Sequence, residues 1–430
     1  MVDRSSSRRA FLKANAAAAM AAALSIARSA HAVGGDLIRV GLIGCGGRGR
    51  GAAVSALNTG KDVRLTAVAD LFDFQAKTSI EQLKKEKPDQ IDVPPERCFV
   101  GFNAYQNLID SGVDVVLIAA AVHFHPMLLC AAIDAGKHVF IEKTHAVDAP
   151  GVRQTIAACE TAAQNRRSVV SGFCWRYNPA VQETMKRISD GAIGRIVAIQ
   201  ACYVVGARRA YARKPDMSEM QYQMWNWYNF HWLSGDQPGA QLVHCLDLAS
   251  WGLGDRPPVK AWGMGGRQVQ TQPEYGDLFD HSAAVFEYES GVRLFAYCRD
   301  QPNCYNEYCV TFVGTKGLAC VPQRCFIQGD SSWSSKSSGG NMYDLEHVAL
   351  FDAVRANQPI NNGNYMATSS ALAILARETC YTGQQITWEQ LMKSESTCAL
   401  PRYDWDVPPP VFPDAKGGYP TAMPGITMFK

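Results

Sequence analysis

The sequence lacks the features that mark metal-binding and nucleic-acid-binding proteins. Its 430 residues include fourteen cysteines, yet no two of them form a C-x-x-C pair or another spacing typical of zinc. The formal net charge is only +2, and no basic stripe with interleaved aromatic residues is present. We therefore expect no metal site and no nucleic-acid partner, and we interpret most cysteines as small core residues.

No apolar run is long enough for a comfortable membrane span. The alanine-rich stretch over residues 14–27 is short and weakly apolar. It follows residues 7–13, which read SRRAFLK and match the twin-arginine export pattern, and it precedes the small-x-small site AHA at residues 30–32. We expect residues 1–32 to be a cleaved twin-arginine signal peptide and the mature chain to be periplasmic or otherwise exported. A disordered basic tail is the alternative.

The stretch over residues 39–70 predicts a dinucleotide-binding unit. An apolar strand (residues 40–43) leads into a G-x-G-x-x-G loop, a helical pattern, and a second apolar strand that ends at an acid. Such a loop brings the pyrophosphate close to the backbone at a helix start, and the acid accepts hydrogen bonds from the ribose. A glycine-rich turn in another α/β protein is the alternative. The residues expected to bind the cofactor here are Gly44, Gly46, Gly47, Arg48, Gly49 and Asp70.

The acid and the signal peptide bear on which cofactor is used and how. Asp70 favours NAD because a carboxylate repels a 2′-phosphate, whereas Arg48 and Arg50 leave NADP as an alternative. Twin-arginine export moves folded proteins, and the periplasm supplies little free NAD. We therefore expect a tightly retained cofactor that is reset in place, either by a second substrate or by reoxidation on the same substrate.

Two further predicted strands end near the same sheet edge. Residues 114–120 and 137–143 have the apolar pattern of buried parallel strands, whose carboxyl ends are where ligands bind. We interpret the histidines that follow the first strand as capping or lining the crevice rather than as metal ligands. The residues expected to border the cofactor at these ends are Ala120, His123, His125, Glu142 and Lys143.

These motifs together resemble the Gfo/Idh/MocA family, which includes glucose–fructose oxidoreductase, inositol dehydrogenases and NAD-dependent glycosidases. The resemblance rests on the glycine loop, the DVVLIAA strand, the histidine–proline turn, AGKHV and Glu142-Lys143. The family signature is E-K-P, whose proline commonly contributes to a cis peptide at the floor of the active site. Thr144 replaces that proline, and a cis bond there costs about 3–4 kcal/mol, so the floor geometry is left open. His145 adds a titratable group that we expect to contact the substrate.

The second half of the chain carries two more elements of the resemblance. Residues 176–179 (RYNP) are similar to the family's R-[FY]-x-P segment, which implies that Arg176 and Tyr177 border the sugar. Residues 235–247 are similar to its D/E-x-x-x-H-x-x-D helix, in which His244 reaches the hydroxyl being oxidised and Asp247 orients it. Ala240 stands where the family usually has an acid, which implies an altered substrate preference or an impaired site. A core histidine on an apolar helix is the plainer alternative for His244.

The domain organisation follows from the change of pattern near residue 172. Alternating strands with tight turns predict a large antiparallel sheet, and residues 211–232 are expected to form an aromatic loop over the site. We expect an α/β Rossmann domain (33–155), then an α+β substrate and oligomerisation domain (156–395) with a large, mostly antiparallel open sheet. An irregular tail (396–430) is expected to wrap the body or a neighbouring subunit. Because an open sheet usually pairs with another subunit, we expect a homodimer or homotetramer.

The resemblance implies an NAD(P)-dependent oxidoreductase that acts on a hydroxyl of a sugar, glycoside or polyol. The implied catalytic residues are Lys143, His244 and Asp247. In one assignment His244 takes the alcohol proton, Asp247 fixes its tautomer, and Lys143 stabilises the alkoxide. In the other, Lys143 is itself the base, because cationic nicotinamide would lower its pKa from about 10.4. The alternatives are a redox-neutral glycosidase or epimerase and a catalytically impaired sugar-binding protein.

Overall fold

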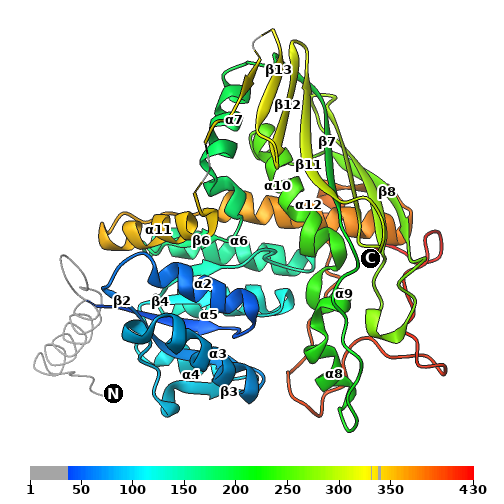
Figure 1. Cartoon of the computed structure of the whole chain (residues 1–430). Helices are drawn as coiled ribbons and strands as arrows, with labels where there is room; N and C mark the ends of the chain where they lie inside the picture. Colours follow the sequence, from blue (N-terminus) through cyan, green and yellow to red (C-terminus); the bar gives the residue numbers. More distant parts are fainter. Residues whose placement is uncertain (1–36, 331, 338–339) are drawn as a thin grey trace, which may run out of the picture.

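Two sheets organise the chain, one in each half (Figure 1). The computed structural model describes residues 37–330, 332–337 and 340–430, so the expected signal peptide lies outside the described residues. The first sheet has six parallel strands in the order β3-β2-β1-β4-β5-β6. The second has nine strands in the order β14-β13-β12-β11-β7-β10-β9-β8-β15. The expected fold class, a Rossmann domain followed by an α+β domain with a mostly antiparallel sheet, is confirmed.

The first domain alternates strands and helices, so that helices cover both faces of its sheet (Figure 1). Its strands are continuous apolar runs, as parallel strands buried on both faces require. They are β1 (Ile38–Ile43), β2 (Val63–Asp70), β3 (Cys98–Val100), β4 (Val115–Ile118), β5 (His138–Ile141) and β6 (Val169–Ser171). The helices are α2 (Gly47–Leu57), α3 (Asp73–Glu86), α4 (Ala104–Asp110), α5 (His125–Asp134) and α6 (Ala149–Gln164).

The sheet of the first domain continues past the boundary expected at residue 155. That position falls inside α6, and β6 follows the helix and pairs in parallel with β5. Asp148 starts α6 by accepting a hydrogen bond from the Gly151 N–H at 2.8 Å, which satisfies one of the unpaired donors of the first turn. The crossover helix and its strand therefore belong to the first domain.

Three helices in the second half of the chain pack on the nine-stranded sheet, namely α7 (Pro179–Ser189), α10 (Val243–Gly252) and α12 (Gly363–Thr382) (Figure 1). Its strands are β7 (Ile196–Val204), β8 (Lys260–Gly266), β9 (His281–Glu287), β10 (Arg293–Arg299), β11 (Glu307–Gly314), β12 (Gly317–Pro322), β13 (Phe326–Gly329), β14 (Trp333–Ser334) and β15 (Ile386–Thr387). The helices are α7 (Pro179–Ser189), α8 (Glu219–Trp225), α9 (His231–Ser234), α10 (Val243–Gly252), α11 (Met342–Arg355), α12 (Gly363–Thr382) and α13 (Trp388–Lys393). β7 and β10 pair in parallel, and the other neighbours are antiparallel.

The strands of this sheet alternate between a buried face and an open face. On β10, Leu294 and Ala296 are buried against the helices, whereas Phe295 between them is 45% exposed. Met264 on β8 is 73% exposed. This alternation is the pattern of an antiparallel sheet with one face on the core. No helix among residues 37–430 that the structure describes has both the length and the apolar character that a membrane span requires.

Residues 211–232, expected to be a loop, contain α8 and the first residues of α9. Ser218 begins α8 by accepting from the Gln221 N–H at 3.2 Å, and Gln221 accepts from the Ser218 N–H at 2.8 Å. This capping box satisfies two donors at the helix start. The S-x-x-Q spacing of a capping box is present in the sequence, but it stands in a segment rich in aromatic residues with little helical periodicity. The tail over residues 396–430 is irregular, as expected.

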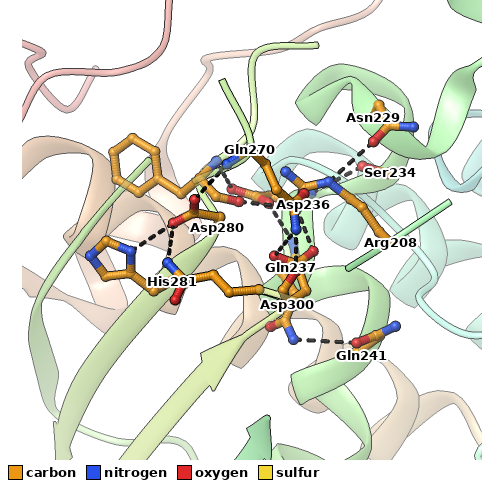
Figure 2. Close-up of polar contacts among 12 residues, drawn as sticks. Arg208, Asn229, Ser234, Asp236, Gln237, Gln241, Gln270, Asp280, His281 and Asp300 are labelled. Atoms are coloured by element: carbon orange, nitrogen blue, oxygen red, sulfur yellow. Dashed lines mark hydrogen bonds and ion pairs between the residues drawn. The ribbon is translucent and has the colours of Figure 1, made fainter. Parts of the chain in front are cut away.

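A buried polar cluster joins the segment after β7 to the end of β10 (Figure 2). The guanidinium of Arg208 donates to Asp300 at 2.5 Å and to Asn229 at 3.1 Å, and both charged side chains are about 1% exposed. Asp280 lies beside this pair in Figure 2 and accepts hydrogen bonds from three successive backbone N–H groups, residues 268–270. A buried ion pair needs further hydrogen-bond partners, and Asn229 supplies one to Arg208.

Candidate active site

A cavity of about 310 Å³ opens at the carboxyl ends of β1, β2 and β4. This is the edge of a parallel sheet where ligands bind. Aromatic side chains from both domains form much of the remaining wall, among them Phe72, Phe102 and Trp225. The expected cofactor residues that line this cavity are Gly44, Gly46, Gly47, Arg48, Gly49, Asp70 and Ala120.

The three motif glycines have the conformations that a dinucleotide loop needs. Gly44 has φ +91°, and a Cβ there would lie 2.5 Å from the backbone of Ala119. A Cβ on Gly49 would collide with the carbonyl of Gly44, whereas one on Gly46 would meet no atom within 4 Å. The first and last glycines therefore permit the turn and the close helix packing, and the middle one leaves open space for a phosphate group.

Asp70 lies at the end of β2 with its carboxylate oriented by the backbone. It accepts hydrogen bonds from the N–H groups of Cys45 at 2.7 Å and Phe72 at 2.9 Å. Burial raises the pKa of Asp70, and these backbone donors act in the opposite direction. Each carboxylate oxygen keeps a lone pair for one more donor, such as a ribose hydroxyl. The open cradle at Gly46 and this carboxylate therefore fit the adenosine diphosphate half of NAD.

Arg48 connects the glycine loop to two buried carboxylates from other elements. Its guanidinium donates to Glu142, directly after β5, and to Glu346 of α11 at 3.2 Å. Burial and the neighbouring Glu142 raise the pKa of Glu346 well above its ordinary value, against the effect of Arg48. Glu346 is not recognisable as a site residue from the sequence, because nothing in its local pattern indicates that α11 returns to the first domain.

The end of β5 meets the turn that precedes α10. The peptide between Lys143 and Thr144 is cis, although threonine replaces the proline of the family signature. The ammonium of Lys143 donates to the carbonyl of Ala240, and the Thr144 hydroxyl donates to the carbonyl of Gly239. Both acceptors belong to the π-helical turn Pro238–Leu242. Burial lowers the pKa of Lys143, against the effect of Glu142.

His244 follows on α10, one turn after Ala240, and lies among aromatic rings. The ring centroid of Trp175 is 4.9 Å from that of His244, and that of Phe173 is 6.2 Å away. Burial, followed by the positive charges of Lys143 and Arg48, lowers the pKa of His244 well below its ordinary value. Its Nδ1 is buried and has no hydrogen-bond partner among the described residues. The imidazole is therefore neutral at physiological pH.

Asp247 does not orient His244, contrary to the sequence expectation. Its carboxylate accepts from the Nε of Arg176 at 2.9 Å and from the hydroxyl of Ser369 at 2.8 Å. The spacing of three residues does place His244 and Asp247 on one side of α10. The carboxylate of Asp247 is instead paired with the guanidinium of Arg176, which the local sequence around α10 does not indicate.

Arg176 and Tyr177 are engaged in contacts within the protein rather than lining the cavity. Arg176 is 10% exposed, donates to Asp255 at 2.6 Å, and lies 3.9 Å from the ring centroid of Tyr365. The hydroxyl of Tyr177 donates to Asn362 at 3.0 Å. These contacts tie the start of the second domain to α10 and α12, so the expected role of Arg176 and Tyr177 in bordering the sugar is not supported by their positions.

His145 is fully buried, which corrects its expected contact with the substrate. Its two ring nitrogens lie 3.0 Å from the hydroxyl of Ser370 and 2.9 Å from that of Ser171. Its exposed fraction is zero, and burial lowers its pKa well below the ordinary value. Two serine hydroxyls satisfy this ring, and so it packs the two domains together rather than facing a ligand.

His123 and His125 lie beside the cavity without lining it. The nitrogens of His125 lie 2.6 Å from the carbonyl of Thr144 and 2.9 Å from that of Ala120. Nε2 of His123 lies 2.7 Å from the hydroxyl of Tyr403 in the tail. Burial lowers the pKa of each histidine to about 4. Within the described residues, no three His, Cys, Asp or Glu side chains gather as a metal site would require.

Two family models match the chain, one on each domain. The model described as an oxidoreductase family with an NAD-binding Rossmann fold matches residues 38–173. The model of the GFO/IDH/MocA C-terminal domain matches residues 181–320. The first match ends just after β6, which agrees with a first domain that extends past residue 155.

Individual relatives agree with these models. An inositol 2-dehydrogenase/D-chiro-inositol 3-dehydrogenase of Halalkalibacterium halodurans is 31% identical over 356 residues, covering 79% of this chain and 90% of the relative. An inositol 2-dehydrogenase of Acidiphilium cryptum is 28% identical over 359 residues, covering 81% of this chain and 94% of the relative.

Solved structures show the same fold. A myo-inositol 2-dehydrogenase from Lactobacillus plantarum superposes with a TM-score of 0.63 at 19% identity, covering 82% of this chain and 99% of that one. A levoglucosan dehydrogenase in complex with NADH and levoglucosan has a TM-score of 0.64 at 17% identity, covering 83% of this chain and all of that one. From the sequence motifs, the two domain matches and the relative at 31% identity, the chain belongs to the Gfo/Idh/MocA family of NAD-binding oxidoreductases.

Proposed function

We propose that this enzyme oxidises a ring hydroxyl of a cyclic polyol or sugar at the junction between Lys143 and His244. The observation that carries the proposal is the hydrogen bond from Lys143 to Ala240, which brings the end of β5 against the turn that leads into His244. The relatives named as inositol dehydrogenases support a cyclitol or a related polyol as the substrate class. NAD, when held in the cavity at Gly46 and Asp70, would supply the hydride acceptor.

Two buried nitrogen groups are available for the proton of the alcohol. Lys143 has a pKa lowered by burial, so a larger fraction of it is neutral near physiological pH than of a surface lysine. His244 is neutral and has an unpartnered nitrogen. Each group is therefore able to act as general base, with the other stabilising the developing alkoxide. Asp247, engaged by Arg176, takes no direct part in this scheme.

Separate substitutions of the two groups test the proposal. Lys143→Met and His244→Ala are compared with the natural protein by the appearance of reduced nicotinamide absorbance with myo-inositol and a panel of sugars. We expect either change to lower kcat at least about 100-fold, the range of a general acid–base contribution, while NAD still binds. Unchanged turnover in both variants would refute the proposed site.

The retained cofactor allows a second reaction mode, in which oxidation at one carbon is reversed after elimination or inversion at its neighbour. The tail contacts described below favour slow release of the cofactor. Enzyme recovered with its bound nucleotide is given glycosides and sugars without added NAD or acceptor. Many products per enzyme would establish the redox-neutral mode. One equivalent at most, with the cofactor left reduced, would establish an oxidoreductase that needs a second substrate.

We further propose that the protein is exported and assembles through the open face of its second sheet. The twin-arginine pattern and the AHA site support export, and the exposed Phe295 and Met264 support assembly through that face. Replacing Arg8 and Arg9 by lysine is expected to keep the protein in the cytoplasm, and the exported form is expected to begin at Val33. Light scattering of the mature protein is expected to give the mass of a dimer or tetramer, and a monomer would refute the assembly.

A further inference from the structure

Two phenylalanines form the wall of the cavity on its adenosine side. Phe72 lies two residues after Asp70 at the end of β2, and Phe102 lies two residues after the end of β3. In this fold the acid after the second strand binds the adenosine ribose, so rings just beyond it face the adenine end of the dinucleotide. Trp225 of α8 adds a third ring to this wall, with its centroid 6.0 Å from that of Phe72.

A second layer of rings stands behind this wall and comes from the C-terminal tail. The centroid of Trp405 lies 4.7 Å from that of Phe102 and 5.6 Å from that of Phe72. These separations are those of favourable aromatic pairs. Trp405 is half-buried and is not among the residues that line the cavity. It therefore reaches a bound ligand only through the two phenylalanines.

Tyr403 fastens the same segment of the tail to the nicotinamide side of the cavity. Its hydroxyl accepts from the Leu400 N–H at 3.3 Å and lies 2.7 Å from Nε2 of His123. Burial lowers the pKa of His123 to about 4, so the imidazole is neutral and one hydrogen bond joins its Nε2 to the tyrosine hydroxyl. The ring of Tyr403 also lies 5.1 Å from that of Phe124, which lines the cavity.

The start of the tail is tied to the first domain. Asp148, which also caps α6, accepts from the Thr397 hydroxyl at 2.9 Å and from the Cys398 N–H at 3.0 Å. Lys430 returns to a residue just before the tail, because the Ser394 hydroxyl donates to the carbonyl of Lys430 at 2.5 Å. The tail is therefore held at both ends.

The middle of the tail is tied to α8 of the second domain. Gln223 donates to the carbonyl of Val411 at 2.6 Å, and the hydroxyl of Tyr419 donates to Glu219 at 2.6 Å. The same helix carries Trp225 to the cavity wall. Since the tail contacts α6 of one domain and α8 of the other, it bridges the two domains beside the cavity.

We propose that Trp405 is a positioning residue for the cofactor. By backing Phe72 and Phe102 it keeps the adenosine side of the cavity closed, so that NAD leaves only after this part of the tail has moved. The inference rests on the proposed function in one respect, namely that NAD is the group that the cavity retains. It assigns to the irregular tail a part in cofactor binding that no motif in the sequence indicates.

The rate of NAD release tests this assignment. Holoprotein is diluted into buffer that contains an NAD-consuming enzyme, and the nucleotide left on the protein is followed with time. We expect Trp405→Ala to release NAD at least about tenfold faster than the natural protein, the effect of losing one aromatic contact. Trp405→Phe, which keeps a ring, is expected to lie between the two. Phe412→Ala is the matched control, because Phe412 is a tail aromatic that is 53% exposed.

Turnover at saturating NAD separates positioning from a general structural role. We expect kcat of Trp405→Ala to stay within about twofold of the natural value while the KM for NAD rises with the release rate. If Trp405→Ala does not fold, the release rate of Trp405→Phe decides, and a rate equal to that of the natural protein overturns the assignment. Equal release from natural protein and Trp405→Ala overturns it as well. Absence of any NAD binding by the natural protein would instead refute the proposed function, and this inference with it.

Discussion

Lys143 donates its ammonium proton to the backbone carbonyl of Ala240, so the two domains meet at the residue that stands in place of the family's acid. An alanine at this position removes a side-chain carboxylate but keeps the main-chain acceptor. The lysine is held in place without a neighbouring negative charge from the turn. Burial is then free to lower its pKa.

Restoring an acid at this position is expected to shift the pH dependence of turnover. In Ala240→Asp a carboxylate next to Lys143 favours the charged ammonium and raises its pKa by about one unit or more. If neutral Lys143 is the base, the pH at which kcat/KM reaches half its maximum rises by the same amount. The measurement is a pH–rate profile with Ala240→Asn as the uncharged control. A profile that does not move would contradict Lys143 as the base.

Removal of Asp247 is expected to destabilise the protein rather than retune His244. Asp247→Ala leaves the guanidinium of Arg176 buried with one partner fewer, which costs about 3–5 kcal/mol in the free energy of unfolding. Unfolding in urea measures this loss, and Asp247→Asn, which keeps a hydrogen-bond acceptor, is expected to lose less. A fully stable Asp247→Ala with a displaced pH–rate profile would restore the orienting role that the helix spacing suggested.

Asp70 is expected to set the preference between NAD and NADP. Asp70→Ala removes both the acceptor for the ribose hydroxyls and the charge that repels a 2′-phosphate. Losing hydrogen bonds to a charged group costs about 1.5–3 kcal/mol, so the ratio of NAD to NADP affinity is expected to fall at least about tenfold. Titration with both nucleotides measures it. Asp73→Ala, which removes an exposed acid from the first turn of α3, is the control and is expected to leave the ratio unchanged.

Asp280 is expected to contribute stability that disappears in acid. Burial opposes its charge, but the backbone N–H groups of residues 268–270 and His281 outweigh burial and lower the pKa of Asp280 to about 2. The contribution is therefore complete above the ordinary pKa of about 3.9 and is lost as the pH falls toward about 2. Asp280→Asn is expected to lower the unfolding free energy by about 1–2 kcal/mol near neutral pH. The difference from the natural protein should shrink below about pH 4, and a constant difference would contradict this origin.

The parts of the site that the sequence predicts are those formed by neighbours in the chain. Gly44, Gly46 and Asp70 belong to one strand–loop–helix–strand unit, so their geometry follows from local pattern and spacing. Lys143 and His244 are paired only through the family resemblance.

The errors arise where a distant element competes for a side chain. The position of His145 close to Lys143 in the sequence predicts contact with the substrate. In the structure its ring is hydrogen-bonded to Ser370 of α12 and Ser171 of β6 instead. Arg176 and Asp247 form an ion pair although 71 residues separate them in the sequence, and no local pattern predicts that pairing. Glu346 and Trp405 were missed for the same reason, since a helix and an irregular tail reach the site only through tertiary packing.

The hydrogen bond from Ser394 to Lys430 brings the end of the tail back to a residue just before its start. A segment that is hydrogen-bonded at its ends and in the middle unfolds as one cooperative unit rather than residue by residue. The free energy of this local unfolding then sets the lifetime of the enzyme–cofactor complex. A denaturant concentration too low to unfold the domains would speed cofactor exchange. The residence time of the cofactor would therefore report on the stability of the tail, whose thirty-odd residues form neither helix nor strand.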